Sequence, residues 1–167
     1  AAQTPDTGIR IGDNYYETIH AAVQAASAGD TIYLSDGTYE ISGTMELRVP
    51  VSIVGESQEG TKVVIKSSEA RGFRIGKGQT GAYAFRNLSV SSDEALALIS
   101  VQAYEEKGFA TVVIDNCALV NNKKTAVDME GTSYPGPDTQ YYNLIVNDCT
   151  ISSAAYGIGY GLDNNTP

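Results

Sequence analysis

The chain has 167 residues, 42% of them hydrophobic and 19% charged, with 17 glycines and no tryptophan. This length and composition predict one mostly β domain and exclude an intrinsically disordered chain. The 20 acidic and 11 basic residues give a formal net charge of −9. That charge disfavours nucleic acid and anionic membranes, and it would also repel an acidic glycan unless a cation bridged the two. No apolar run of about eighteen residues is present, so no membrane-spanning helix is predicted.

The first 28 residues predict an edge segment followed by a helix. The chain opens with Ala-Ala-Gln-Thr-Pro rather than Met, as in an exported protein whose signal peptide has been removed, and we expect a secreted, periplasmic or cell-surface location. Residues 1–14 predict a leader or edge strand. Residues 15–28 predict a helix, with Asn14 and Glu17 as a capping box and Gly29 as its end. Its apolar stripe would cover the open end of the coils that follow.

Residues 30–162 predict short β-strands that repeat with a period near thirty residues. Four equivalent positions, 53, 85, 114 and 146, lie 32, 29 and 32 residues apart. In the last three copies, an apolar strand end is followed by a polar corner with Asn or Asp and then by a new apolar residue. A fold of antiparallel hairpins would need a tight two-residue turn between paired strands, and only Asp36-Gly37 fits one. The period instead predicts a parallel β-solenoid of about four to five coils in a single domain.

Alternation along each strand separates inward from outward positions. In one strand type of each coil, the inward residues form pairs at a spacing of two: Phe73 and Ile75, Ile99 and Val101, Val127 and Met129, and Ile158 and Tyr160. The two cysteines, Cys117 and Cys149, occupy one slot in successive repeats, so they should be stacked about 4.8 Å apart. A disulfide prefers Cβ atoms about 3.8 Å apart. Two buried thiols are therefore favoured, and a disulfide is the alternative.

Several strings resemble the opening of pectin-lyase-like right-handed β-helix proteins. They are Thr18-Ile19-His20-Ala21-Ala22-Val23, the segment 25–34, Asp36-Gly37-Thr38-Tyr39-Glu40 and Val51-Ser52-Ile53-Val54-Gly55-Glu56. The resemblance extends from about Tyr15 onward and is specific for fold, not for activity. It implies an all-β, right-handed parallel β-helix with an N-terminal capping helix. It also implies that the corner residues Asn87, Asn116 and Asp148 form an internal ladder that caps turn amides.

In enzymes of this superfamily, substrates lie along the outer face of one sheet. The matching outward positions here include Arg74, Ser100, Asp128 and, after the inward pairs, Gln102 and Glu130. Asp128 and Glu130 point to one side of a strand, about 6.6 Å apart at Cα, and two such carboxylates can share calcium. The pattern is similar to the calcium-binding carboxylate pairs of some lyases, although Asp-x-Glu is short and common.

Lyase chemistry on uronic acids needs a cation to neutralise the carboxylate and a base to remove the C5 proton. Lys123, Lys124 and Arg74 are the basic groups available for catalysis near this face. An exposed lysine pair has no evident cause for the lowered pKa that a base requires. A solvated charged face is therefore the alternative interpretation.

Tyrosines form the second predicted binding set. Tyr134, Tyr141 and Tyr142 lie in or beside an insertion that carries Pro135-Gly136-Pro137, and Tyr104 lies in the equivalent loop one coil earlier. Their rings, with Gln102, could contact sugar rings as substrate-binding residues. Ordinary loop packing is the alternative, because tyrosine is abundant in this chain, with 11 copies.

These observations favour an exported β-helix that interacts with a polysaccharide or oligosaccharide, as part of a calcium-dependent lyase acting on acidic glycans. A noncatalytic surface or adhesin-type scaffold is the alternative. The last repeat is followed by Asp163-Asn164-Asn165-Thr166-Pro167, which offers no predicted cap. An uncovered final coil would favour aggregation, so we expect either a truncated part of a longer helix or end-to-end self-association through the C-terminal coil.

Overall fold

A computed structural model describes residues 6–102, 108–129 and 140–160, with the backbone alone at 140, 141 and 160. Fifteen strands in this part of the chain form two sheets around one core. The larger, sheet A, contains β1 (Ile9–Ile11), β2 (Asn14–Tyr15), β3 (Thr31–Leu34), β4 (Gly37–Ile41), β6 (Ser52–Gly55), β7 (Thr61–Ile65), β9 (Gly81–Ser92), β11 (Gly108–Asn121), β13 (Gln140–Asn147) and β14 (Thr150–Ser153). Sheet B contains β5 (Met45–Leu47), β8 (Phe73–Ile75), β10 (Ile99–Val101), β12 (Val127–Met129) and β15 (Ile158–Tyr160).

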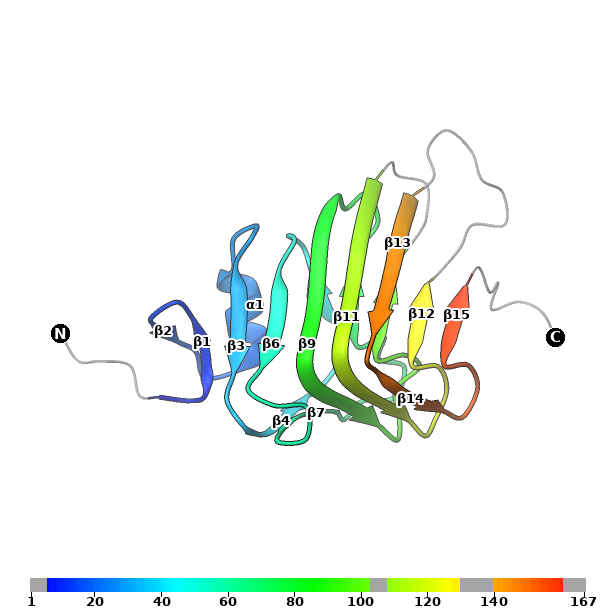
Figure 1. Ribbon diagram of the computed structural model, residues 1–167, viewed down its shortest axis with the longest axis horizontal. Coiled ribbons are helices and arrows are strands. Elements are labelled where there is room, and N and C mark those ends of the chain that lie inside the picture. Colours follow the sequence, from blue (N-terminus) through cyan, green and yellow to red (C-terminus); the bar gives the residue numbers. More distant parts are fainter. Residues whose placement is uncertain (1–5, 103–107, 130–139, 161–167) are drawn as a thin grey trace.

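The strands wind as a parallel β-solenoid, as the repeat predicts. Sheet B has the order β15-β12-β10-β8-β5, and every pairing in it is parallel. Figure 1 shows the long strands β9, β11 and β13 of sheet A side by side, with β12 and β15 of sheet B to their right in this view. The β-solenoid makes about three turns. The antiparallel pairings in the described chain join β1 to β2 and to β3.

The repeat positions stack one above another. Ile32, Ile53, Phe85, Ile114 and Val146 are successive partners across sheet A. The first four are fully buried, and Val146 in the last rung is partly buried. The period therefore identifies the core correctly, because alternation sends every second side chain of each strand to the inside.

The predicted corner ladder is present, but its side chains lie towards the outside. Asn87, Asn116 and Asp148 have φ values of 56°, 50° and 49°, the left-handed region that Asn and Asp tolerate best among residues with a side chain. The Asn116 amide donates to Asn87 Oδ1 at 3.1 Å, and both Asn116 and Asp148 are exposed. The hydrogen bond between Asn116 and Asn87 thus joins two turns from the outer surface, and the predicted internal position of these residues is wrong.

The helix is shorter than residues 15–28. Helix α1 (Ile19–Ala25) is the single helix of the described residues. Thr18, not Asn14, is its N-cap, and the Thr18 hydroxyl accepts a hydrogen bond from the Ala21 N–H at 3.0 Å. Asn14 pairs instead in the β1–β2 hairpin, whose strands satisfy its backbone. As predicted, α1 lies at the N-terminal end of the stack (Figure 1) and buries Ile19 against the core.

Both cysteines are free thiols. Cys117 is fully buried and donates to the Phe85 carbonyl at 3.3 Å, whereas Cys149 in the last rung is partly buried. Burial raises the pKa of the Cys117 thiol to about 12. The favoured prediction of two free thiols is therefore confirmed, and its expectation of burial holds for Cys117 but only partly for Cys149.

Candidate functional site

The outer face of sheet B brings together the charged residues that the sequence places there. Strand register puts Glu46, Arg74, Ser100 and Asp128 in one column across β5, β8, β10 and β12. Glu46 and Arg74 are neighbours in this column and form an ion pair, with Arg74 Nη1 3.8 Å from Glu46 Oε1. The alternation that predicted this column is confirmed. The column forms because each of its residues lies between two buried apolar neighbours on its own strand.

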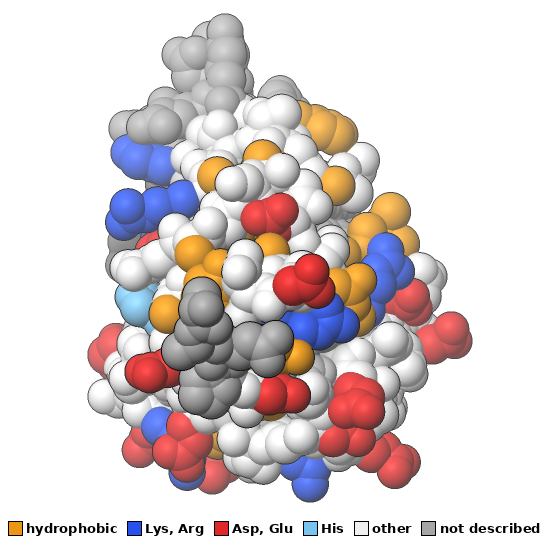
Figure 2. Space-filling model, turned by 90° about the vertical axis from the view of Figure 1, so that its left-hand side faces the viewer, with side chains coloured by type: hydrophobic (Ala, Val, Ile, Leu, Met, Phe, Trp, Pro, Cys, Tyr) orange, Lys and Arg blue, Asp and Glu red, His pale blue; other side chains and the backbone are white. Residues whose placement is uncertain are grey.

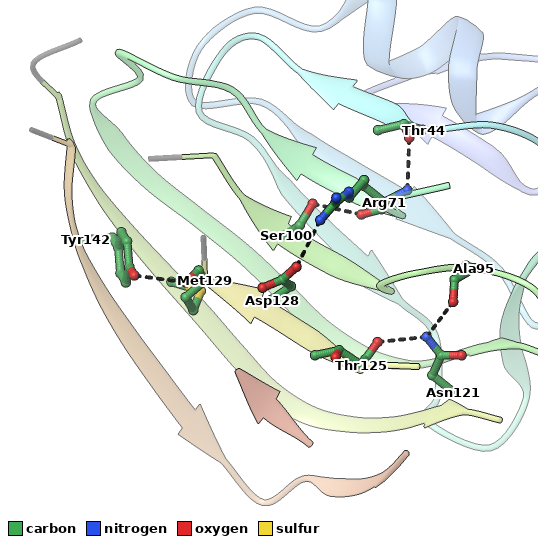
Figure 3. Close-up of polar contacts among 9 residues, drawn as sticks. All are labelled: Thr44, Arg71, Ala95, Ser100, Asn121, Thr125, Asp128, Met129 and Tyr142. Atoms are coloured by element: carbon green, nitrogen blue, oxygen red, sulfur yellow. Dashed lines mark hydrogen bonds and ion pairs between the residues drawn. The ribbon is translucent and has the colours of Figure 1, made fainter. Parts of the chain in front are cut away.

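Arg71 is the residue that completes this face, and the sequence patterns do not identify it. Its Nη1 lies 3.1 Å from Asp128 Oδ2, and the two side chains are 23% and 13% exposed. Arg71 precedes β8 by two residues but reaches β12, two strands away in the sheet. Figure 3 shows its guanidinium directed at the Asp128 carboxylate.

The backbone of Arg71 is held on both sides. Its N–H donates to Thr44 Oγ1 at 2.9 Å, and its carbonyl accepts from Ser100 Oγ at 2.8 Å (Figure 3). Gly72 follows with φ 63°, and a Cβ there would lie 1.9 Å from the Leu98 carbonyl oxygen. Only glycine therefore fits at this corner. Ser100, an outward residue by alternation, is fully buried because it serves this contact.

Asp128 is a buried carboxylate in contact with Arg71 and under the electrostatic influence of two further cations. Burial raises its pKa above the ordinary value of 3.8, and the charges of Arg71, Lys124 and Arg74 oppose that rise. Three basic side chains, two from corners and one from a strand, thus act on the same carboxylate. The predicted catalytic residues Arg74 and Lys124 are brought together here, around Arg71 and Asp128.

A buried asparagine shapes the corner that carries the two lysines. Asn121 ends β11, and its Oδ1 accepts the backbone N–H groups of Lys123 and Lys124 at 3.0 and 3.3 Å. Its Nδ2 donates to the carbonyls of Ala95 and Thr125 at 3.1 and 2.7 Å (Figure 3). Lys124 is thereby held beside β12 and half-buried, whereas Lys123 is exposed.

The predicted sugar-binding residues do not gather in the described part of the chain. Tyr142 packs against the hydrophobic core, and its hydroxyl donates to the Met129 carbonyl at 3.2 Å (Figure 3). This placement is structural rather than that of an open sugar platform. Gln102 is partly exposed just after β10, with its N–H donating to the Ile75 carbonyl. Tyr104, Tyr134 and the side chain of Tyr141 lie outside the described residues.

The described donor set around Asp128 fits an anion better than calcium. Calcium takes six to eight oxygen ligands, but here a guanidinium contacts the carboxylate and two further cations act on it. Glu130, the predicted partner of Asp128, lies outside the described residues. Among the residues that are described, no group of three or more His, Cys, Asp or Glu side chains could hold a metal ion.

Charge is unevenly distributed over the surface. Figure 2, viewed from the N-terminal end, shows most Asp and Glu side chains towards the lower edge and lower right, and Lys and Arg side chains in several places, one of them the upper left. The chain as a whole carries a net charge of −9. Because local potential depends on nearby charges, an acidic protein with separated basic groups can still attract an anion to one face.

Comparison of the chain with protein-family models, curated proteins and solved structures found no match. Within the described ranges, no helix has the length and apolar character needed to cross a membrane.

Proposed function

We propose that this protein is an exported, right-handed, pectin-lyase-like β-helix that binds an acidic polysaccharide along the outer face of sheet B. In this proposal the solenoid has four to five coils. The observation that carries the proposal is the grouping of Arg71, Arg74 and Lys124 around Asp128 in a chain that is otherwise acidic.

The chemistry of this grouping suits a uronate or a sulfate ester. Guanidinium groups pair with carboxylates and sulfates through parallel N–H···O bonds, which gives both affinity and orientation. The Arg71 and Arg74 side chains are 23% and 21% exposed, so a ligand on the outer face can reach them. Asp128 holds the Arg71 guanidinium in place and keeps the local charge from becoming strongly positive in the absence of ligand.

This arrangement changes the role that a bridging cation would have. Because the net charge of the chain is negative, the sequence predicts calcium as the bridge between the protein and an acidic glycan. In this proposal Arg71, Arg74 and Lys124 outnumber the carboxylates Glu46 and Asp128 on this face, so the protein itself supplies positive charge for the glycan. Calcium bound by Asp128 and Glu130 remains the alternative, and it predicts that EDTA abolishes binding.

A lyase is the second candidate function, and the environment of Asp128 favours it. A buried carboxylate with a raised pKa is a stronger base than an ordinary one, and neighbouring cations would stabilise the charge that develops when a C5 proton is removed. Lys123 and Lys124 are the other predicted catalytic groups. A noncatalytic scaffold, and self-association through the last rung, remain predictions that binding and sedimentation measurements test.

Affinity gel electrophoresis tests the binding proposal. Pectate, alginate and chondroitin sulfate are cast into gels, with dextran as the neutral control, and each gel is run with calcium and with EDTA. We expect retardation in at least one acidic glycan under both conditions and none in dextran. Equal mobility in all gels would overturn the proposal. Ultraviolet absorbance of unsaturated product, followed in the same solutions, separates a lyase from a binding protein.

A further inference from the structure

The N-terminal end of the molecule contains a contact between two metal-ligating side chains. His20 Nδ1 on α1 lies 3.4 Å from Met45 Sδ on β5. His20 is the single histidine of the chain, and Met45 is one of two methionines. The function proposed above does not use this contact.

Both side chains are placed by well-anchored backbone. His20 lies in the first turn of α1, next to the Thr18 cap and the buried Ile19. Met45 begins β5, where its N–H donates to the Gly72 carbonyl at 2.8 Å, and the residue is 3% exposed. An exposed imidazole thus lies over a buried thioether.

Space and charge next to the contact suit a cation. His20 and Met45 both line a cavity of about 620 Å³, whose wall also contains Glu17, Tyr39 and Glu40. The two carboxylates there favour positive charge, and the cavity gives an ion a route to the sulfur without disturbing the core.

The separation of the two atoms matches coordination to a single ion. Typical metal bonds are about 2.0 Å to an imidazole nitrogen and about 2.3 Å to sulfur. With those lengths, atoms 3.4 Å apart subtend an angle of about 105° at the metal, close to the tetrahedral value. A thioether is a soft ligand that selects Cu(I) and related ions over calcium or magnesium.

We propose that His20 and Met45 bind a soft monovalent cation of the Cu(I) type, with solvent or a cavity carboxylate completing its coordination. The Nδ1 atom and the thioether sulfur supply the two protein ligands. The competing explanation is a hydrogen bond from Nδ1–H to sulfur, which is a weak acceptor.

Silver(I) provides a redox-inert probe of this site. The protein is labelled with ¹³C at the methionine methyl groups, and Ag(I) is titrated while the Met45 and Met129 signals are followed. Met129 is the matched control, because it is buried in β12 with 1% exposure. We expect the Met45 methyl signal to shift and that of Met129 to stay. A Met45 signal that does not move at excess Ag(I) would overturn the proposal.

Two variants separate metal binding from other causes. His20→Ala should abolish the Met45 shift or weaken the affinity for Ag(I) by about tenfold or more. The same shift at the same affinity in His20→Ala would show that the histidine is not a ligand. Because Cys117 and Cys149 also bind silver, the titration is repeated in a Cys117→Ala/Cys149→Ala background. If that variant does not fold, the two methyl signals of the parent protein still report on each methionine separately.

Discussion

Two Arg–Asp pairs lie on the outer faces of this solenoid, and they differ more in burial than in distance. Arg71 and Asp128 on sheet B are 3.1 Å apart with side chains 23% and 13% exposed, whereas Arg86 and Asp115 on sheet A are 2.9 Å apart and 42% and 33% exposed. The exposed pair links adjacent strands β9 and β11 in register. The comparison shows that a short distance alone does not set the strength of an ion pair, because solvent screens the exposed pair more strongly.

The two ion pairs should differ most in how much each contributes to the stability of the fold. Arg71→Ala leaves the Asp128 carboxylate buried without its closest cation, and we expect it to lower the free energy of unfolding by about 2 kcal/mol, less than for a fully buried pair. Arg86→Ala, the matched control, should cost about 0.5 kcal/mol or less. Urea denaturation at neutral pH measures both. Equal losses in the two variants would remove the distinction between the pairs.

The pH dependence of stability in Asp128→Asn tests whether burial makes the Arg71–Asp128 pair different from the exposed pair. The folded-state pKa of Asp128 is raised above 3.8, so just above that pH the folded state holds a proton that the unfolded state has lost. The wild type therefore loses stability through this residue as pH rises from 3.8 through the folded-state pKa. We expect Asp128→Asn to gain stability relative to the wild type over the same window.

Urea denaturation of both proteins at several pH values measures this difference. Asp115→Asn, at the exposed pair, is the control variant. A relative loss of stability with rising pH in Asp128→Asn would mean that Arg71 and its neighbours outweigh burial and lower the pKa of Asp128.

The smallest expected difference between the two ion pairs is in how strongly salt weakens each of them. Double-mutant cycles give the coupling energy of each pair. Between about 0.05 M and about 1 M NaCl we expect the Arg86–Asp115 coupling to fall close to zero, while Arg71–Asp128 retains about half of its coupling or more. Parallel loss in both pairs would indicate that Asp128 is as well solvated as Asp115.

The sequence predicts the fold well because its signal is periodic. The positions Ile53, Phe85 and Ile114 stack as the repeat requires, and the column through Arg74 and Asp128 follows from alternation. Alternation gives the direction of a side chain but not its exposure. Asp128 therefore points outward as expected and is nevertheless buried.

The parts that the sequence does not predict belong to corners and to contacts between distant segments. Arg71 lies in a corner, where no period fixes the direction of a side chain, and its partner is 57 residues away. Tyr142 lies beside a Pro- and Gly-rich segment and resembles a loop residue in sequence, but it belongs to β13 and packs on the core. The one local sequence feature beside Arg71 is Gly72, which follows it at the entry to β8 and does not by itself indicate where the arginine side chain points.

Isothermal titration calorimetry with acidic oligosaccharides tests the central claim most directly. The ligands are oligogalacturonate, its methyl ester, oligoalginate and a chondroitin oligosaccharide, each with EDTA present. We predict that at least one acidic ligand binds and that the ester does not. Arg71→Gln/Arg74→Gln should weaken binding by about tenfold or more, and Arg86→Gln should bind as the wild type does. Equal affinity for the ester, or unchanged affinity in the double variant, would contradict the assignment of the outer face of sheet B as the glycan site.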